Sequence, residues 1–455
     1  MSINQTEVIV TENVVIGEPG IIPNQNRKSP FAFGLGNFGT SILVETFNGY
    51  AYFYYIDFLG LAITSAALVR TIFTAWDAIN DPLMGFLSDH TRTRWGRRRP
   101  WLFPSLPLFM MVFVLVFSAP ASYKSTSWLL PYMLMVMLAY ETLITIIGIN
   151  YSALYPELFR TLVERTRVAV FCQSGNVLGL LLGLSLSPLL YGVLGFSRMA
   201  LIYALVGGSL FFISLWFNRE NPASHPQSPW SNIKPIILRI LVDRVFWFYT
   251  LMMILTLFAT GLVSFALPFY VKYALHASTG VTSLLSGAAL LSSLATMPVW
   301  TRLVNVWKPR RVFLISTCVI GIGILGLGLL PHIPFAVLSA VIFGAALQGI
   351  NITHIVVRAS LISRNIGRTG MQNEATYYGM MNSALRLGGL LQALVMLLAG
   401  VIFGYVSGEN PGSQPDLAFR YLISAFPLVA LFLGGIVGWW FFGLFSPDAD
   451  LLTAG

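Results

Sequence analysis

Residues 76–101 read Trp76-Asp-Ala-Ile-Asn-Asp-Pro-Leu-Met-Gly-Phe-Leu-Ser-Asp-His-Thr-Arg-Thr-Arg-Trp-Gly-Arg-Arg-Arg-Pro-Trp101, and they decide the fold. The first half of this stretch is part of an apolar segment, yet it carries Asp77 and Asp81. The second half is a short, strongly basic turn. Carboxylates inside a membrane helix are unfavourable and are usually kept for function. The stretch therefore predicts a membrane helix with a functional acidic site, followed by an arginine cluster at the membrane surface.

The composition predicts a membrane protein that crosses the bilayer many times. The chain has 455 residues, of which 56% are hydrophobic and only 10% charged, whereas soluble domains carry roughly 25% charged residues. The net charge of +9 is better explained by basic cytoplasmic loops than by a nucleic-acid partner. The two cysteines, Cys172 and Cys318, form no C-x-x-C motif, so neither a disulfide framework nor a zinc site is indicated.

Runs of about 20 apolar residues predict an all-α membrane protein with twelve transmembrane helices in two six-helix bundles. The helices are expected near 33–57, 62–89, 101–119, 127–155, 168–194, 199–217, 245–272, 280–304, 312–330, 334–359, 376–405 and 419–446. The predicted units are a disordered cytoplasmic tail (1–30), an N-terminal bundle (31–217), a cytoplasmic central loop (218–243), a C-terminal bundle (244–447) and a cytoplasmic C-terminal tail (448–455).

Basic residues predict the orientation. Most of the 27 lysines and arginines fall in the loops and helix ends on one side of the predicted spans. Because cytoplasmic loops carry the excess of Lys and Arg, both termini are expected in the cytoplasm of a multi-pass protein in the cell (inner or plasma) membrane. The second predicted helix of each half is followed by a basic turn, Thr91–Pro100 in one and Val306–Arg311 in the other. Such matching halves are typical of transporters built from structural repeats.

Three oxygen-bearing side chains precede the basic turn. Asp77 and Asp81 are four residues apart, so they share one helix face with Cβ atoms about 5–6 Å apart, and Asn80 lies beside them. Pro82 removes a backbone hydrogen bond and frees carbonyl oxygens next to the carboxylates. This set of hard oxygen ligands suits Na⁺ or H⁺. The alternative is a structural ion pair with Arg70, two turns earlier.

Other ionisable residues also fall inside predicted spans. Arg386 lies about ten residues into its span, too deep to reach the interface comfortably, so it is expected to pair with a carboxylate across the bundle, such as Asp77 or Asp81. It would then be a coupling charge that alternates with the cation. Glu45 and Glu141 are candidates for contacts with a substrate or a proton. The individual roles of Arg70 and Glu141 stay open, and His354 and Arg358 are expected at the membrane interface.

The basic turn predicts a cytoplasmic latch between the two bundles. The latch residues are Gly85, Asp89, Arg94, Gly96, Arg97, Arg98 and Arg99. Orientation alone also explains arginines here, and the two explanations are compatible. No G-x-x-x-x-G-K-[ST] phosphate loop, zinc motif or dinucleotide fingerprint occurs in the sequence, so no enzyme, ATP-driven pump or cofactor is predicted.

Several motifs together resemble one transporter family. They are Gly34–Gly39, Trp76–Gly85 with Thr93–Trp101, Tyr151–Leu158, Glu164–Arg167, Thr369–Gly379 and Arg386–Gly388. The chain resembles the glycoside–pentoside–hexuronide:cation symporters, the melibiose-permease branch of the major facilitator superfamily. This resemblance implies the major facilitator fold and a cation site of Asp77, Asn80, Asp81 and Thr145. It also places Arg386 where the family carries a lysine on its eleventh helix.

The sequence departs from that family at the positions that recognise sugar. The family's carboxylates on helices 1 and 4 fall at Ser41 and Gly148, its helix 5 arginine falls at Cys172, and the aspartate before the loop between helices 10 and 11 falls near Ser360. Glu45, one turn from Ser41, and Asn150, beside Gly148, are expected to supply substitute polar contacts. The substrate candidates are therefore Ser41, Glu45, Gly148, Asn150 and Cys172.

The sequence thus predicts a monomeric secondary transporter that moves a sugar-like or glycoside-like solute with Na⁺ or H⁺ by alternating access. Its expected partners are a small-molecule substrate, a monovalent cation and the lipid bilayer. Eukaryotic members of the resembled family carry lysophospholipids, so an amphiphile carrier on the same fold is the alternative. A non-transporting membrane scaffold or sensor is a third possibility, although a scaffold has no use for two carboxylates in a membrane helix.

Overall fold

A computed structural model describes residues 28–91, 93, 95–124, 126–159, 162–219, 238, 240–329, 331–369, 374–404 and 414–445. The predicted N-terminal tail, central loop and C-terminal tail lie wholly or mostly outside this described part. Within it, every regular element is a helix, apart from one isolated bridge between Thr93 and Gly96.

The first half of the chain supplies six helical passes. Its elements are α1 (Pro30–Phe53) with the π-helical turn η1 (Tyr54–Phe58), α2 (Ile63–His90), α3 (Arg99–Val116), the short η2 (Ala121–Tyr123), α4 (Leu129–Leu158), α5 (Leu162–Leu180) with η3 (Leu181–Leu186) and α6 (Ser187–Leu194), and α7 (Phe196–Phe217). A π-turn inside a helix often marks a functional region, and here η3 joins α5 to α6 without ending the helical pass.

The second half supplies six more. Its elements are α9 (Arg244–Tyr273), α10 (Thr279–Leu329), α11 (Ile333–Thr369), α12 (Glu374–Leu385), α13 (Gly388–Phe403), α14 (Pro415–Ile423) and α15 (Ala425–Leu444). Helix α10 is two helices joined at Lys308, whose φ of 69° breaks the helical backbone directly before Pro309. This break falls in the second basic turn, between the two spans that the sequence predicts there.

Nine described helices are long and apolar enough to cross a membrane, with α10 counted once. Helices α1 and α2 complete the set, since their polar side chains lower their hydropathy but not their length. The described chain therefore makes the twelve predicted passes. Large apolar side chains such as Val193 (82% exposed), Met135 (72%) and Phe432 (70%) lie on the outside, as expected where lipid replaces water as the solvent.

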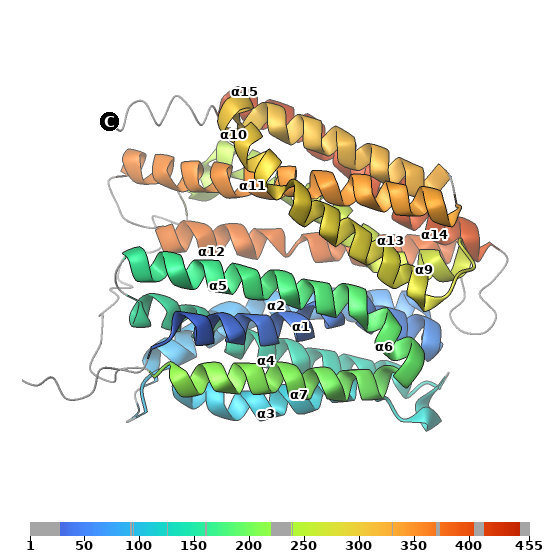
Figure 1. The fold of residues 1–455 in the computed structure, drawn as a ribbon, viewed down its shortest axis with the longest axis horizontal. Helices are drawn as coiled ribbons and strands as arrows, with labels where there is room; N and C mark the ends of the chain where they lie inside the picture. Colours follow the sequence, from blue (N-terminus) through green and yellow to red (C-terminus); the bar gives the residue numbers. More distant parts are fainter. Residues whose placement is uncertain are drawn as a thin grey trace, which may run out of the picture.

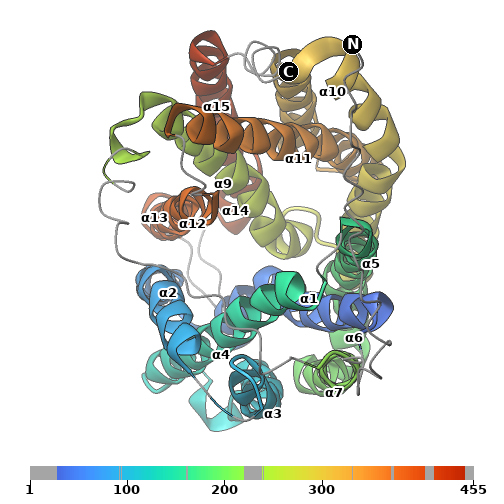
Figure 2. The same ribbon diagram turned by 90° about the vertical axis from the view of Figure 1, so that its left-hand side faces the viewer.

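The two halves lie one above the other in Figure 1, with α1–α7 below and α9–α15 above. They meet where α2 packs against α13, where α1 approaches α9, and where η3 and α6 pack against α10. Figure 2 shows the first of these seams end-on, with α2 beside the α12–α13 pair. One large cluster of buried aromatic and aliphatic side chains includes residues of both halves, and a smaller cluster lies within the second half.

The halves are tied together at the end opposite to the basic turn, which we call the closed end. Lys272 Nζ donates to Asp57 Oδ2 at 2.6 Å, and the Tyr273 hydroxyl also donates to the Asp57 carboxylate. Phe53 of α1 packs edge-on against Phe269 of α9, with ring centroids 5.0 Å apart. We call the other end, which carries residues 95–99, the arginine end.

Helix α12 stops at Leu385 and α13 starts at Gly388, so the eleventh pass is a broken helix with Arg386 at the break. Two backbone hydrogen bonds span the break, each to the residue three positions earlier. The Leu387 amide donates to the Ala384 carbonyl, and the Gly389 amide donates to the Arg386 carbonyl. Gly389 lets this pass approach α2, since a Cβ there would lie 2.6 Å from Thr74 Oγ1. Broken membrane helices commonly hold binding sites at the break.

Candidate functional site

A central cavity of about 980 Å³ opens between the halves. Its walls come from α1, α4 and α5 of the first half and from α9, α10 and α11 of the second. The lining segments of α1, α4, α5, α9 and α11 are those nearer the arginine end, so the cavity and the closed end lie on opposite sides of the molecule. This volume is within the usual range for small-molecule sites, about 300–1,000 Å³.

Three of the predicted substrate candidates line this cavity: Ser41, Glu45 and Gly148. The Ser41 hydroxyl donates to the Asn176 carbonyl at 3.1 Å, which fixes α1 against α5. Gly148 faces empty space, because a Cβ built there meets nothing within 4 Å. At Ser41 and Gly148, where the resembled family carries carboxylates, this chain therefore places no charged side chain in the cavity wall.

The other two candidates do not line the cavity. Asn150 is fully buried and its amide donates to the Ile146 carbonyl at 2.8 Å, one turn back on the same helix. Cys172 packs against the hydrophobic core of the first half. Each stands next to a lining residue, Tyr151 and Gln173 respectively, because neighbouring residues on a helix point in directions about 100° apart.

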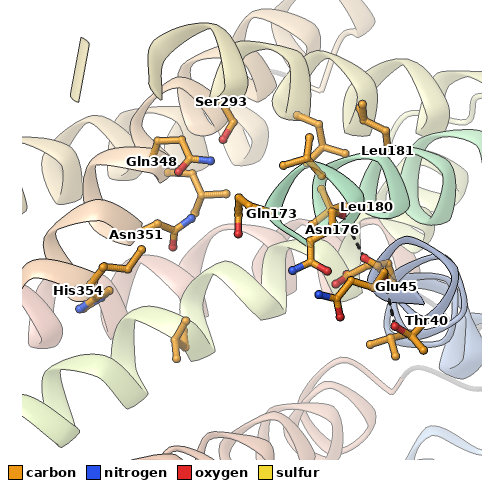
Figure 3. A pocket seen from close by; sticks show the side chains of 18 of the residues that line it. Thr40, Glu45, Gln173, Asn176, Leu180, Leu181, Ser293, Gln348, Asn351 and His354 are labelled. Atoms are coloured by element: carbon orange, nitrogen blue, oxygen red, sulfur yellow. Dashed lines mark hydrogen bonds between the residues drawn. The ribbon is translucent and has the colours of Figure 1, made fainter. Parts of the chain in front are cut away.

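Amide side chains form much of the polar wall, and sequence reasoning missed them. Gln173 and Asn176 of α5 lie across the cavity from Gln348 and Asn351 of α11 (Figure 3). Both pairs follow the pattern Gln-x-x-Asn, which puts the two amides on one helix face. The repetition of this pattern in helices from both halves was the available signal.

His354 continues the polar face of α11, one turn beyond Asn351 (Figure 3). The sequence predicts an interfacial position, but the residue lines the cavity with only 4% of its surface exposed. Neither ring nitrogen has a hydrogen-bond partner among the described residues. A buried imidazole without a partner is unfavourable.

The acidic site lies beside the cavity, at the seam between α2 and α13. Arg386, at the break between α12 and α13, forms ion pairs with both Asp77 and Asp81 of α2. All three side chains are partly buried. The contact between Arg386 and these carboxylates is the one the sequence suggests, and it joins the two halves of the molecule.

Helix α4 brings further polar groups to the same seam. The Thr145 hydroxyl lies 3.3 Å from Asp81 Oδ1 and 3.4 Å from Glu141 Oε1, so it can donate to either carboxylate. Asn80 is fully buried, and its Nδ2 donates to the Glu141 carbonyl at 3.4 Å. The structure therefore brings Asp77, Asn80, Asp81 and Thr145 together, and it adds Glu141.

The described hydrogen-bond partner of Arg70 is Gln392, whereas the alternative considered above was an ion pair with the carboxylates of α2. Its Nη2 donates to Gln392 Oε1 of α13 at 2.9 Å, and its guanidinium lies 5.7 Å from the Tyr52 ring and 5.6 Å from the Phe73 ring. The described ion pair of Asp77 is with Arg386. Two arginines thus cross the seam between α2 and α13, and each meets a polar group of the other half.

The predicted latch follows α2 at the arginine end. Gly96 has a φ of 103° and closes a tight turn onto Thr93. Arg98 Nη1 donates to Ser88 Oγ at 2.7 Å, and Arg99 Nη2 donates to the Leu215 carbonyl of α7 at 3.3 Å. These described contacts hold the turn to its own half. Arg94 and the side chain of Asp89 lie outside the described residues, and the role of the latch stays a prediction.

Solved structures share this architecture. The nucleoside transporter NupG superposes with a TM-score of 0.64 at 12% identity, covering 90% of this chain and 98% of its own. A bacterial homologue of the human lysosomal transporter Spinster, inward-facing and occupied, superposes with a TM-score of 0.67 at 13% identity, covering 92% and 97%. At such low identities these similarities establish the fold alone.

Curated relatives are similar in sequence. An uncharacterised symporter of Synechocystis sp. is 34% identical over 33% of this chain and 29% of its own length. The isoprimeverose transporter of Lactiplantibacillus pentosus is 24% identical over 64% and 61%. The sodium-dependent lysophosphatidylcholine symporter 1 of Mus musculus is 31% identical over 30% and 27%. In each case the match spans less than two thirds of the relative.

A family profile covers nearly the whole chain. The profile of the family described as MFS/sugar transport protein matches residues 32–445, from the start of α1 to the end of α15. The twelve helical passes, the broken helix and the central cavity all lie within this range. So does the cluster of Arg386 with Asp77 and Asp81. The chain therefore belongs to the MFS/sugar transport protein family and has a multi-pass membrane transporter fold.

Proposed function

We propose that this protein is a secondary active transporter that couples movement of a monovalent cation, Na⁺ or H⁺, to movement of a sugar-like organic solute by alternating access. One observation carries the proposal: Arg386 of the second half pairs with Asp77 and Asp81 of the first half, next to a cavity lined by both halves. A charge contact that joins two bodies is the kind of contact that a competing cation can open and close.

The two carboxylates suit such competition. They share one face of α2, and Asn80 and Thr145 add further oxygens there. A small cation bound among these oxygens would displace the Arg386 guanidinium, since both need the same carboxylates. Ligands shift a conformational equilibrium through their differential affinity for its two states. Cation binding would then change the stability of the contact between halves, which is the requirement for coupling.

The amide side chains of the cavity wall, which also carries Glu45 and Arg358, support a hydroxyl-rich substrate. Gln173, Asn176, Gln348 and Asn351 are uncharged, and each amide offers both donors and an acceptor. Sugar hydroxyls also donate and accept, so the two sets match. Charged galactoside-binding residues of the resembled family are absent from positions 41, 148 and 172, which argues for a different solute. The similarity to the isoprimeverose transporter supports a sugar or glycoside.

Uptake into proteoliposomes tests this proposal. Purified protein would be given radiolabelled isoprimeverose and a panel of glycosides, under an imposed Na⁺ gradient or pH gradient. We expect accumulation of at least one glycoside above its outside concentration with one of the two gradients. In Asp77→Asn and Asp81→Asn we expect that gradient-driven accumulation to disappear while the protein still folds. Accumulation that persists in both variants would show that these carboxylates are not the coupling site.

A lysolipid or another amphiphile is the second candidate substrate. The cavity also carries an aliphatic wall that includes Ile144, Ile147, Leu257, Leu290 and Leu294, and such a wall suits an acyl chain. The similarity to the lysophosphatidylcholine symporter supports the same possibility. Competition separates the candidates: lysophosphatidylcholine that blocks glycoside uptake at low concentration, and is itself transported, would favour the amphiphile.

The basic turns support an orientation with both termini in the cytoplasm, because the arginine end would then face the cytoplasm. In that orientation the central cavity opens inward and Asp57, Lys272 and Tyr273 close the outer side. We propose that residues 91–99 form the inner latch when the cavity faces outward.

A further inference from the structure

Glu141 is a third carboxylate at the seam between α2 and α13, and the resemblance to the symporter family assigns it no role. Only 8% of its surface is exposed. Its Oε1 lies 3.4 Å from Thr145 Oγ1, which lies 3.3 Å from Asp81 Oδ1. The single hydroxyl hydrogen of Thr145 can therefore be given to Glu141 or to Asp81, but not fully to both. Glu141 and Asp81 compete for one donor.

The charges around Glu141 do not cancel. On its own helix it faces Tyr140 and Thr145, and from α2 it faces Asp81 and Arg70. The Tyr52 hydroxyl of α1 lies within electrostatic range as well. In the described part of the seam, the carboxylates of Asp77, Asp81 and Glu141 are opposed by the guanidinium groups of Arg70 and Arg386. One negative charge is left over, and an uncompensated buried charge is strongly unfavourable.

A second observation points to a ligand at the same place. Asn80 is fully buried, and its Oδ1 has no hydrogen-bond partner among the described residues. Its Nδ2 donates to the Glu141 carbonyl, so this amide group lies against α4 beside Glu141. A buried acceptor without a donor loses the hydrogen bond that it makes in water. A cation, or a donor that arrives with it, would satisfy this oxygen.

We propose that Glu141 is part of the coupling site, and that one small monovalent cation binds between Glu141 and Asp81 with Thr145 and Asn80 Oδ1 as further oxygen ligands. This proposal rests on the proposed function and extends it by naming an additional ligand and the number of cations. The excess of one negative charge sets that number at one. Chemistry does not separate Na⁺ from a proton here, so the experiment uses both.

The same geometry explains how binding would loosen the halves. A cation between Glu141 and Asp81 draws the Asp81 carboxylate toward α4 and neutralises it. Arg386 then loses part of the charge that holds it to α2. Release of the cation restores that charge and the ion pair reforms. Glu141 thereby makes the contact between the halves depend on the cation, whereas Asp77 and Asp81 alone are already balanced in charge by the two arginines.

Cation-dependent thermal stability of the purified full-length protein tests the proposal. Wild type, Glu141→Gln and the matched control Glu164→Gln would be unfolded in NaCl or choline chloride at constant ionic strength, and over a pH series. Glu164 pairs with Lys28 at the surface, 2.7 Å away, where such pairs contribute little. We expect Na⁺ or acid to raise Tm in wild type and in Glu164→Gln. In Glu141→Gln the cation concentration for half-maximal effect should rise at least roughly tenfold.

Several results would overturn the proposal. One is a cation concentration for half-maximal effect that is the same in Glu141→Gln as in wild type, even if the variant has a lower Tm without added cation. Another is a wild type whose Tm neither Na⁺ nor acid raises. If Glu141→Gln does not fold, Glu141→Asp replaces it, because the shorter side chain keeps the charge but withdraws the oxygens from Thr145. This variant must weaken the cation effect too. Uptake assays separate the two claims: cation stabilisation that needs Glu141, without any solute uptake, would support this site and refute the proposed symport.

Discussion

Replacing Arg386 by glutamine removes the cation that holds Asp77 and Asp81 across the seam between the halves. The two carboxylates then repel each other on one face of α2. With Cβ atoms about 5–6 Å apart and an effective dielectric constant of about 20, two unit charges at this separation repel by about 3 kcal/mol. Breaking a buried ion pair by removing one partner typically costs 3–5 kcal/mol. Because all three side chains are partly exposed, we expect the lower value, about 3 kcal/mol.

The expected consequence is a change in how stability depends on the cation. In wild type the Arg386 guanidinium already pairs with Asp77 and Asp81, so added Na⁺ or protons must compete with it. Arg386→Gln has no such competitor, so its Tm should be lower than that of wild type in choline buffer. Addition of Na⁺ or acid should then raise its Tm by more than that of wild type. The measurement is thermal unfolding in detergent, followed by tryptophan fluorescence at constant ionic strength.

Arg386→Lys is the matched control, since it keeps the charge and carries the residue that the resembled family has there. Its stability should respond to the cation much as wild type does, although one point charge replaces the planar guanidinium. If Arg386→Gln were as stable as wild type without added cation, the ion pairs would not be what joins the halves. The coupling argument built on them would then be wrong.

Two further substitutions test the cavity and the closed end. Gly148→Phe should fold normally and raise KM for the transported solute more than roughly tenfold, because its ring enters open space in the cavity. Gly148→Ala is the control. An unchanged KM in Gly148→Phe would show that the substrate binds elsewhere. Asp57→Asn removes the ion pair with Lys272 and should shift the population toward the state open at that end by about 1 kcal/mol, or roughly fivefold. Faster thiol labelling of a cysteine placed at Phe53 would report this shift, and an unchanged rate would contradict it.

Much of the fold was predictable because hydrophobic length is a strong signal. The twelve passes agree with the predicted spans, including the two that meet at Lys308. The predicted ends of α5 and α11 were wrong by several residues: α5 starts at Leu162 rather than near 168, and α11 runs to Thr369 rather than 359. Hydropathy measures the length inside lipid, and these helices continue as polar helix beyond it.

The break before α13 was not predicted, although its parts are in the sequence. A span of 376–405 was expected as one helix, whereas the chain breaks between Leu385 and Gly388. The pair Gly388-Gly389 next to a membrane arginine was the signal. Arg386 was expected to meet a carboxylate, because a deeply placed arginine needs a partner, and it contacts two.

The cavity wall was harder to predict, because a single sequence does not say which helix faces meet. Ser41, Glu45 and Gly148 face the cavity, whereas Asn150 and Cys172 are turned away from it. The amides of α5 and α11 were not predicted, since Gln and Asn carry no charge. His354 was expected at the membrane interface, whereas it lines the cavity. Their position relative to one another depends on packing between the two halves, which a single sequence does not give.

Solute accumulation driven by a membrane potential is the most direct test of the central claim. One charge moved across 100 mV is worth about 2.3 kcal/mol, which corresponds to roughly fifty-fold accumulation for one coupled cation. Wild-type proteoliposomes at that potential should approach this ratio for the transported solute. Asp77→Asn should equilibrate the solute at a ratio of about one. A wild type that only equilibrates its solute, or an Asp77→Asn variant that still concentrates it, would contradict cation-coupled transport at this site.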